Sequence, residues 1–417
     1  FFAGFSAFGL CGRKSCCFYK KYDILFLSKN ERERLMKNKT MYQFALYYFM
    51  LIGGMGCFYP YINVYLEQTL HLSGGQIGLI NSVSLLISIM ILPIWGMISD
   101  KTKRYKDLLL LSLVLSIISL YFYSKQSVYL GVLVLAILFK STSLPSSSLS
   151  DTITIDYTKK HGGDYGLIRG MGSFGYCIAS VVVGKIIDYF NQDGPLFICY
   201  MVMLLVAILL ALSFPKPNTS SDTKEKVPFT SLFKNKNYLI LLLVVLFSQV
   251  VIDSAGNYNG NHLVVTLGES YSLISIYTFL MVLPEALFLM VASKVINKLG
   301  YKKYMLFAIG LMILRLFIYS QTHNPTLFII VSLVHCFGFA LSSVLGLSYI
   351  QEQVDPNTIG TAISFYNVTI NLGNALFGYV FGIIYQYQNS FHIYLVSIFL
   401  VLISLFLVLT HQFEKQI

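Results

Sequence analysis

Two opposite charges lie inside neighbouring apolar segments, one on each side of a short polar turn. Asp151 comes about eight residues before the turn at 159–163, and Arg169 follows it at a similar distance. If the segments are antiparallel helices, which rise about 1.5 Å per residue, the two side chains lie at a similar depth and can face each other across a cavity. A carboxylate accepts hydrogen bonds and a guanidinium donates them, which suits adjacent hydroxyl groups of a polar solute.

The segment after Arg169 adds an aromatic ring to this face. Tyr176 lies seven residues, or about two helical turns, further on. We expect its ring to lie beneath a ring of the solute. Between the two, Gly172, Ser173 and Gly175 leave the backbone bare enough for a neighbouring helix or a ligand to approach.

Six ionisable side chains lie inside or at the edge of apolar segments. An ionised group at the centre of a bilayer costs about 2.5–3.5 kcal/mol on insertion scales, so each needs a partner or a water-filled space. Ion pairs that only hold helices together are the alternative interpretation. Six such groups together favour a polar central cavity. They are Lys140, Asp151, Arg169, Asp253, Glu285 and Arg315.

The second half of the chain contains the groups best suited to carry a proton. A carboxylate that loses its partner or its water takes up a proton more readily, which makes Asp253 and Glu285 candidates. His335, twenty residues after Arg315, either belongs to the same network or is a hydrogen-bonded core residue. Asn257, with the amides that follow it, either binds solute hydroxyls or caps a broken helix.

Composition defines the class of protein that positions these residues. The chain of 417 residues is 56% hydrophobic and 12% charged, whereas soluble domains are about 25% charged. Apolar windows of about 20 residues predict an all-α membrane protein with twelve transmembrane helices. The segments are too long, and alternate too little, for an outer-membrane barrel. The expected spans are residues 42–66, 74–98, 107–124, 128–150, 165–190, 194–214, 238–262, 270–292, 304–321, 325–349, 358–385 and 388–411.

The net charge of +11 does not indicate a nucleic-acid partner, because of where the basic residues lie. Lysines and arginines concentrate in the tail and in alternate loops, all on one side of a twelve-span layout. On the opposite side, Lys125 is the clear basic loop residue. This is the positive-inside pattern, which predicts a multi-pass protein of the cell membrane with both termini in the cytoplasm.

The spans divide into two bundles of six, residues 41–214 and 238–412, joined by a polar cytoplasmic linker at 215–237. Two halves of this kind are the layout of a transporter that rocks them around a central site. Residues 1–40 are expected to be a cytoplasmic tail or an extension that the working protein lacks.

The loop after the second span carries a cluster of charged residues at the membrane surface. Asp100, Lys101 and Arg104 can lock helices together there and release them when the halves move, and Gly96 allows close helix approach. The alternative is a simple positive-inside loop. The pattern recurs, because Ser293 and Asn297 stand 197 positions after Gly96 and Asp100, which indicates a weak internal repeat.

Twelve spans in a 6+6 arrangement, with GMISDKTKRYK after the second, resemble the major facilitator superfamily. The loop matches that family's signature at Gly96, Asp100 and Lys101, and departs from it at Lys103, where the signature has Gly. Within the superfamily, the patches around Pro60, this loop and YGLIRGMGSFGY resemble lactose permease and the phenylpropionate and nucleoside proton symporters.

This resemblance implies roles for particular residues. Asp151 and Arg169 match the sugar-binding acid and arginine of lactose permease, and Tyr176 falls where that permease has a stacking Trp. Arg315 and His335 match its proton-coupling network.

The match is incomplete in the second half. The permease needs a proton-carrying glutamate where this chain has Gly338, and a lysine where it has Ser332. Glu285 matches its second sugar-binding acid only approximately, about one helical turn out of register. Proton coupling by the permease's own route is therefore not implied.

No nucleotide-binding loop, metalloprotease motif, nucleophile elbow or paired cysteine motif occurs, so we expect neither an enzyme nor a cofactor nor a metal. The sequence predicts a monomeric secondary transporter that takes up a small polar solute, such as a sugar or glycoside, with protons. The alternatives are symport of an aromatic carboxylate or a nucleoside, a drug or solute exporting antiporter, and a receptor with a transporter fold.

Overall fold

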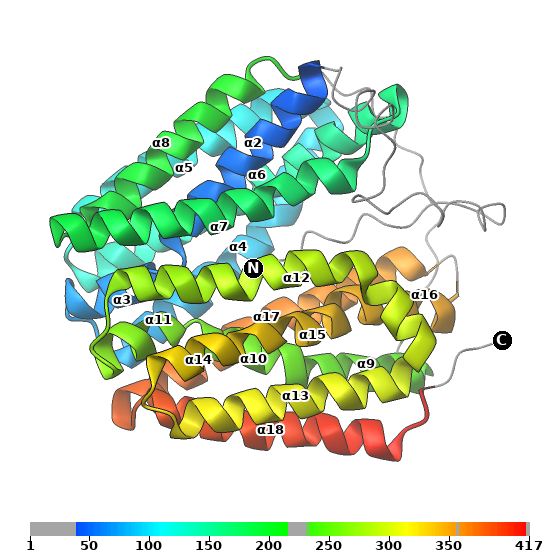
Figure 1. Ribbon diagram of the computed structural model, residues 1–417. Helices are drawn as coiled ribbons and strands as arrows, with labels where there is room; N and C mark the ends of the chain where they lie inside the picture. Colours follow the sequence, from blue (N-terminus) through cyan, green and yellow to red (C-terminus); the bar gives the residue numbers. More distant parts are fainter. Residues whose placement is uncertain (1–38, 216–231, 233, 356–357, 414–417) are drawn as a thin grey trace, which may run out of the picture.

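The computed structural model describes residues 39–215, 232, 234–355 and 358–413. Within them, twelve helical segments are long and apolar enough to cross a membrane, which confirms the predicted all-α membrane fold. No strand occurs in this part of the chain. The predicted tail up to residue 38 and most of the linker lie outside the described residues. Figure 1 shows the two groups of six spans, the first half above the second.

The first half is built of nearly continuous helices, because in a bilayer a helix satisfies its own backbone hydrogen bonds. Pro60 interrupts the first span: one helix ends at Phe58 and the next begins at Ile62. The six spans are α2 (Lys39–Phe58) with α3 (Ile62–Gln68), α4 (Gly74–Thr102), α5 (Tyr105–Lys125), α6 (Tyr129–His161), α7 (Tyr165–Phe190) and α8 (Gly194–Ala211).

The second half is less regular. Its seventh span consists of α9 (Lys236–Val245), η4 (Leu246–Val250) and α10 (Val251–Gly256), followed by α11 (Asn259–Asn261) and η5 (His262–Thr266). Its tenth span consists of α14 (Pro325–Val331), η6 (Ser332–Val334), α15 (His335–Ala340), η7 (Leu341–Leu345) and α16 (Gly346–Gln353). The π-helical turns η4, η5 and η7 are of a kind that concentrates at functional sites. The other spans are α12 (Tyr271–Leu299), α13 (Tyr301–Gln321), α17 (Ile359–Tyr387) and α18 (Ser390–Thr410).

The bare backbone predicted in the fifth span accommodates a neighbouring helix rather than a ligand. At Gly172, a Cβ atom would collide with Ile52 of α2, and at Gly175 with the backbone of Phe49. A Cβ at Gly53 of α2 would in turn lie 3.1 Å from the carbonyl oxygen of Gly175. The small residues therefore let α2 and α7 pack backbone to backbone, which fixes the face of α7 that carries Arg169.

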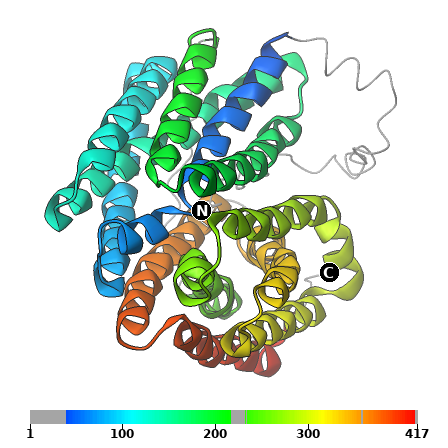
Figure 2. The same cartoon turned by 60° about the vertical axis from the view of Figure 1, so that its left-hand side comes forward.

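The two halves meet along two helix pairs, α4 with α17 and α7 with α12 (Figure 2). Glycines form the α4–α17 crossing, where a Cβ at Gly78 would lie 2.9 Å from the carbonyl oxygen of Gly378 and 3.1 Å from the Cα of Gly382. The phenol of Tyr258 donates to the same Gly378 carbonyl over 3.1 Å. Gly378 and Gly382 thus form a contact between the halves.

Two carboxylates also join the halves near this crossing. Asp188 of α7 accepts hydrogen bonds from the backbone N–H groups of Tyr271 (2.9 Å) and Ser272 (2.8 Å), and so caps the first turn of α12 in the other half. Glu67 of α3 accepts from Asn261 at 2.6 Å and from Tyr385 at 2.8 Å. These charge-assisted bonds, exposed at Asp188 and half-buried at Glu67, hold the halves together at this end.

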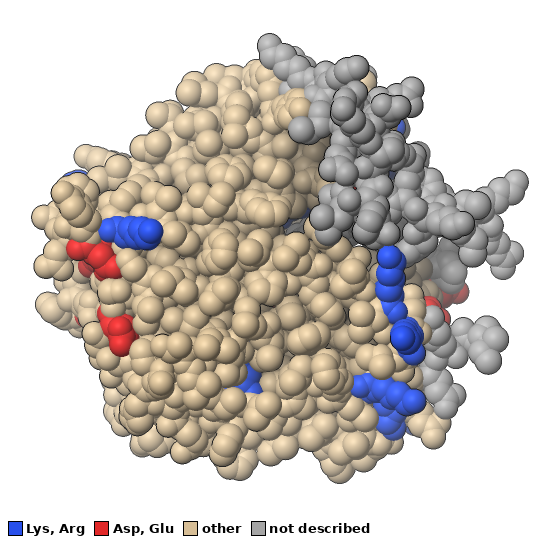
Figure 3. All heavy atoms as spheres, viewed as in Figure 1, with Lys and Arg blue, Asp and Glu red and all other residues tan. Residues whose placement is uncertain are grey.

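The opposite end carries the loops after α4 and α12, and basic side chains gather there in the space-filling view (Figure 3). Nothing lies within 4 Å of a Cβ built at Gly96 of α4 or at Gly360 of α17, so no helix contacts either glycine at this end. The close helix approach predicted at Gly96 is therefore wrong for this conformation. We name this end the basic end; its cytoplasmic location stays a prediction.

The turn after α4 explains the departure from the family signature. Lys103 ends the helix in the left-handed conformation, with φ of 56°, which glycine adopts without strain and other residues rarely adopt. Gly300, 197 positions later, ends α12 with φ of 82°. The same positive φ recurs at matching positions of the two halves, although only one of them is a glycine.

Candidate functional site

In the first half, the structure brings Asp151 and Arg169 together from α6 and α7. The Nε of Arg169 lies 3.7 Å from Oδ1 of Asp151, and the two side chains are only 10% and 17% exposed. The same Oδ1 accepts a hydrogen bond of 2.7 Å from the hydroxyl of Tyr48 on α2. The guanidinium of Arg169 lies 5.1 Å from the centre of the Tyr48 ring, a cation–π distance.

This arrangement leaves hydrogen-bonding capacity unused. Within the described part of the chain, Nε and Nη1 of Arg169 are buried and have no hydrogen-bond partner. A buried donor without an acceptor costs about 1–3 kcal/mol, more when it is charged. Arg169 therefore presents two oriented donors that an incoming oxygen atom can satisfy, beside a carboxylate that can accept from a hydroxyl group.

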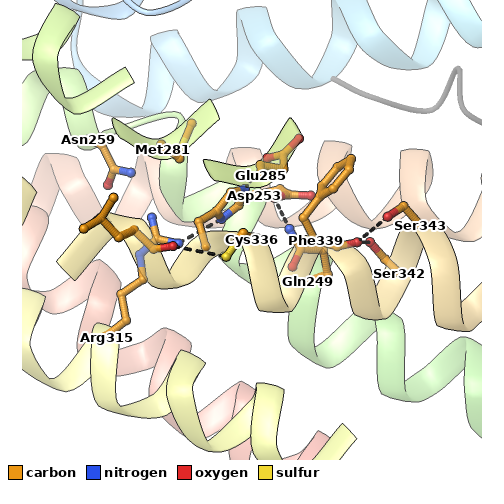
Figure 4. Close-up of polar contacts among 12 residues, drawn as sticks. Gln249, Asp253, Asn259, Met281, Glu285, Arg315, Cys336, Phe339, Ser342 and Ser343 are labelled. Carbon is orange, nitrogen blue, oxygen red and sulfur yellow. Dashed lines mark hydrogen bonds and ion pairs between the residues drawn. The ribbon is translucent and has the colours of Figure 1, made fainter. Parts of the chain in front are cut away.

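In the second half, three residues from different helices form a chain of polar contacts (Figure 4). Arg315 of α13 lies 2.9 Å from Nδ1 of His335 on α15. Because a guanidinium can only donate, Nδ1 is the acceptor, and the imidazole carries its proton on Nε2. That Nε2 lies 3.4 Å from Oε2 of Glu285 on α12. The contacts orient a neutral histidine between a cation and a carboxyl group.

A second carboxyl group lies beside this chain. Asp253 of α10 accepts a hydrogen bond of 2.6 Å from Gln249, one turn earlier, and its charge repels that of Glu285. Figure 4 shows the two carboxyl groups next to each other. The cluster thus holds two carboxyl groups and one guanidinium, that of Arg315, with His335 neutral. It has one negative charge in excess unless a carboxyl group binds a proton.

The position at which the family pattern has a glutamate is filled from another helix. At Gly338, a Cβ atom would lie 2.8 Å from Oε1 of Gln249. The absent side chain leaves room for the Gln249 amide, which donates to Asp253. Gly338 thus gives space to the residue that positions the carboxyl group of α10.

Other predicted site residues lie elsewhere. Tyr176 is half-buried against the hydrophobic core, and no hydrogen bond or ring contact joins it to Asp151 or Arg169 within the described chain. Asn257 lies at the break after α10, where its backbone oxygen accepts from Asn63 of the first half over 2.8 Å. The amides after Asn257 were expected either to bind solute hydroxyl groups or to cap a broken helix. Asn259 supports a structural role, because it donates to Tyr277 and accepts from Tyr394.

The signature loop is held by local contacts at the basic end. Tyr105 donates to Asp100 over 2.6 Å, and Arg104 pairs with Asp107 at 2.7 Å. Lys101 is exposed. Gating by these residues stays a prediction.

Sequence reasoning missed the tyrosines that complete both clusters. Tyr48 contacts Asp151 and Arg169, while Arg315 donates to Tyr277 over 3.1 Å and lies 5.0 Å from the ring centre of Tyr319. No spacing rule connects Tyr48 with Asp151 or Tyr277 with Arg315, whereas Tyr319 lies one turn after Arg315 on the same helix. A local signal did exist for Gln249, because an amide four residues before an aspartate lies on the same helix face.

Two six-helix halves that meet along α4 with α17 and along α7 with α12, and that bury polar clusters within their spans, define a secondary transporter of the major facilitator type. A sequence profile of the MFS_1 like family matches residues 41–396, and the chain belongs to that family. It is therefore a multi-pass membrane transporter and not an enzyme.

Its relatives are transporters. The chain is 30% identical to the uncharacterized transporter YwbF of Bacillus subtilis (strain 168) over 356 residues, 84% of this chain and 88% of the relative. It is 26% identical to the maltose permease of Geobacillus stearothermophilus, covering 80% of this chain and 84% of that permease. Among solved structures, the nucleoside transporter NupG shares the fold, with a TM-score of 0.76 at 19% identity, covering 89% of this chain and 98% of NupG.

Proposed function

We propose that the protein imports a small neutral polar solute, a sugar or glycoside, together with protons, by alternating access of its two halves. The observation that carries this proposal is the state of Arg169, whose buried Nε and Nη1 have no partner among the described residues while a carboxylate lies beside them. A hydroxyl group can accept from Arg169 and donate to Asp151 at once. Adjacent hydroxyl groups of a sugar ring supply such pairs.

The second cluster supports coupling to protons. Asp253 and Glu285 share one guanidinium, so the site is neutral only when one carboxyl group is protonated. Moving a buried net charge through the membrane is costly, and a bound proton removes that cost. The halves are expected to exchange positions when this cluster is neutral.

The relatives also support a sugar as the solute. Besides the maltose permease, the chain resembles a sucrose permease of Escherichia coli at 22% identity. A probable 3-phenylpropionic acid transporter of Escherichia coli (strain K12) is 23% identical, and the unpartnered donors of Arg169 equally suit a carboxylate. Symport of an aromatic carboxylate is therefore the second candidate. A nucleoside, and export by antiport, stay as alternatives.

The test is uptake of labelled maltose, sucrose, uridine and 3-phenylpropionate into proteoliposomes, with and without an inward proton gradient. We expect a gradient to drive accumulation of at least one sugar, and Arg169→Ala to abolish it. Lys185→Ala, which removes an exposed cation from the same helix α7, is the matched control. Sugar uptake that survives Arg169→Ala unchanged would show that the solute binds elsewhere.

A further inference from the structure

The eleventh span carries a row of amides that the proposed pocket does not yet include. Asn367, Asn371 and Asn374 follow one another at spacings of four and three in α17, which places them on one helix face. An asparagine side chain costs free energy in a transmembrane helix unless it bonds to a polar partner. Three asparagines on one face therefore need polar partners in the protein or in a solute. All three are half-buried.

The rotation of α17 about its axis is fixed by three consecutive residues. Gly373 meets Leu246 and Val250 of η4, and the side-chain oxygen of Asn374 accepts from Ser254 of α10 at 3.0 Å. The backbone oxygen of Ala375 accepts from Ser82 of α4, in the other half, at 2.5 Å. The amide face therefore points between the seventh span and α4, toward the junction of the halves.

The same face continues to Gly378, four residues beyond Asn374, where it meets Gly78 of α4 in the closed crossing. Toward the basic end, positions 360 of α17 and 96 of α4 have no neighbouring atoms within 4 Å of a Cβ, so the two helices do not touch at these glycines. The amides of Asn367 and Asn371 thus lie on the face that fronts the other half, between the closed crossing and Gly360.

The lipid-facing side of the helix is a different one. Val368, Leu372 and Leu376, spaced by four residues, are 40%, 50% and 60% exposed. They provide an apolar surface of the kind that lipid covers, about a third of a turn from the asparagines. The amide row therefore does not lie on the lipid-exposed side of α17.

Little of the hydrogen-bonding capacity of the row is used within the protein. Asn374 uses its oxygen for Ser254, and Asn371 donates to the backbone oxygen of Asn367 at 2.8 Å. The side chain of Asn367 has no partner among the described residues. Unpaired amides offer both donors and acceptors without charge, which matches a neutral solute that carries several hydroxyl groups.

We propose that Asn367, Asn371 and Asn374 form a second solute-binding surface, which binds hydroxyl groups at one end of a sugar whose other end lies between Asp151 and Arg169. This inference rests on the proposed function and assigns its substrate to neutral sugars of more than one ring. The row is about 10 Å long, seven residues at about 1.5 Å each. A solute bound from both halves links them in one complex, as alternating access requires.

The test compares Asn367→Ala and Asn371→Ala with Leu372→Ala, a control on the lipid-facing side of the same helix. Uptake of labelled maltose into proteoliposomes gives the half-saturating concentration and the maximal rate, and thermal unfolding in detergent gives the stability. Since a neutral hydrogen bond contributes about 0.5–1.5 kcal/mol, each asparagine variant should raise the half-saturating concentration about two- to tenfold. Asn367→Ala should leave the melting temperature unchanged, because its side chain bonds to no described residue.

Each other result overturns the inference. If the asparagine variants lower the maximal rate and the melting temperature but not the affinity for maltose, the row is structural. If the unaltered protein transports 3-phenylpropionate and no sugar, and Asn367→Ala leaves that transport unchanged, the row binds no solute and the substrate class is wrong. If the unaltered protein transports none of the probes in either direction, the proposed function itself fails and this inference fails with it.

Discussion

The two polar clusters of the molecule differ in their charge balance and in how completely they are bonded. The first-half pair, Asp151 with Arg169, is neutral as a whole, yet leaves two buried guanidinium donors without partners. The second-half cluster connects Arg315, His335 and Glu285 in a chain of contacts, and with Asp253 it holds two carboxyl groups for one guanidinium. The unused donors of the first cluster can bind a solute. The second cluster has more carboxyl groups than guanidinium groups, which favours binding of a proton. The difference suggests that one fold divides binding and coupling between its halves.

Arg169→Ala should have the largest effect. Its loss leaves Asp151 buried without the cation that compensates it, and breaking a buried pair costs about 3–5 kcal/mol. Solute uptake should fall by more than about a hundredfold, both with and without a proton gradient. Initial rates of uptake in proteoliposomes measure this.

A double variant tests whether Arg169→Ala loses uptake only because it is less stable. Asp151→Asn combined with Arg169→Ala removes both charges and should recover thermal stability without recovering uptake. If the double variant regained uptake as well, the pair would be a structural staple rather than a binding site.

Glu285→Gln should separate coupling from binding. The substitution removes the excess negative charge of the second cluster while the first-half pair stays intact. We expect accumulation against a concentration gradient to vanish while exchange of labelled for unlabelled solute continues. Counterflow and gradient-driven uptake, measured in the same vesicles, distinguish the two activities.

Glu269→Gln, in the loop before α12, is the matched control and should retain accumulation. Loss of counterflow in Glu285→Gln would place this carboxyl group in the solute site instead, and the division between halves would be wrong.

Tyr48→Phe should weaken the first cluster alone. The ring stays over Arg169, but the 2.7 Å hydrogen bond to Asp151 is lost. A hydrogen bond to a charged group contributes about 1.5–3 kcal/mol, so the half-saturating concentration should rise about tenfold or more. The dependence of uptake on external pH should not change; a changed pH profile would mean that the two clusters are coupled directly.

His335→Gln should have the smallest effect. Glutamine keeps an acceptor for Arg315 and a donor for Glu285, and the contacts of His335 describe a neutral bridge. We expect accumulation to fall about threefold or less, within the range of one neutral hydrogen bond. Complete loss of accumulation, with counterflow retained, would show that the imidazole itself carries the proton.

The local part of the first site could be predicted because it depends on helical periodicity. Antiparallel helices around a short turn put Asp151 opposite Arg169, whereas the pairing of Arg315 with His335 was implied by the family resemblance. The same reasoning failed for Tyr176, since a shared helix face does not say which neighbour covers it. In the structure, the backbone of Tyr176 packs against Gly56 of α2.

Contacts between distant segments could not be predicted. The ring beside Arg169 comes from Tyr48, 103 residues before Asp151. The hydroxyl that accepts from Arg315 comes from Tyr277 on α12. The amide row of α17 was present in the sequence as a periodic pattern. Which part of the molecule it faces depends on the rotation of α17 about its axis and on the path of α4 beside it. Neither property can be read from one segment.

The membrane class, the twelve spans and the charged residues that must avoid lipid could be read from the chain alone. These follow from local physical rules, because an apolar helix satisfies its own backbone and a buried charge needs a partner wherever it lies. Which partner each charge obtained, and at which end the halves close, could be known only from the packed helices. Those outcomes depend on how separate helices rotate and cross, and packing between them sets both at once.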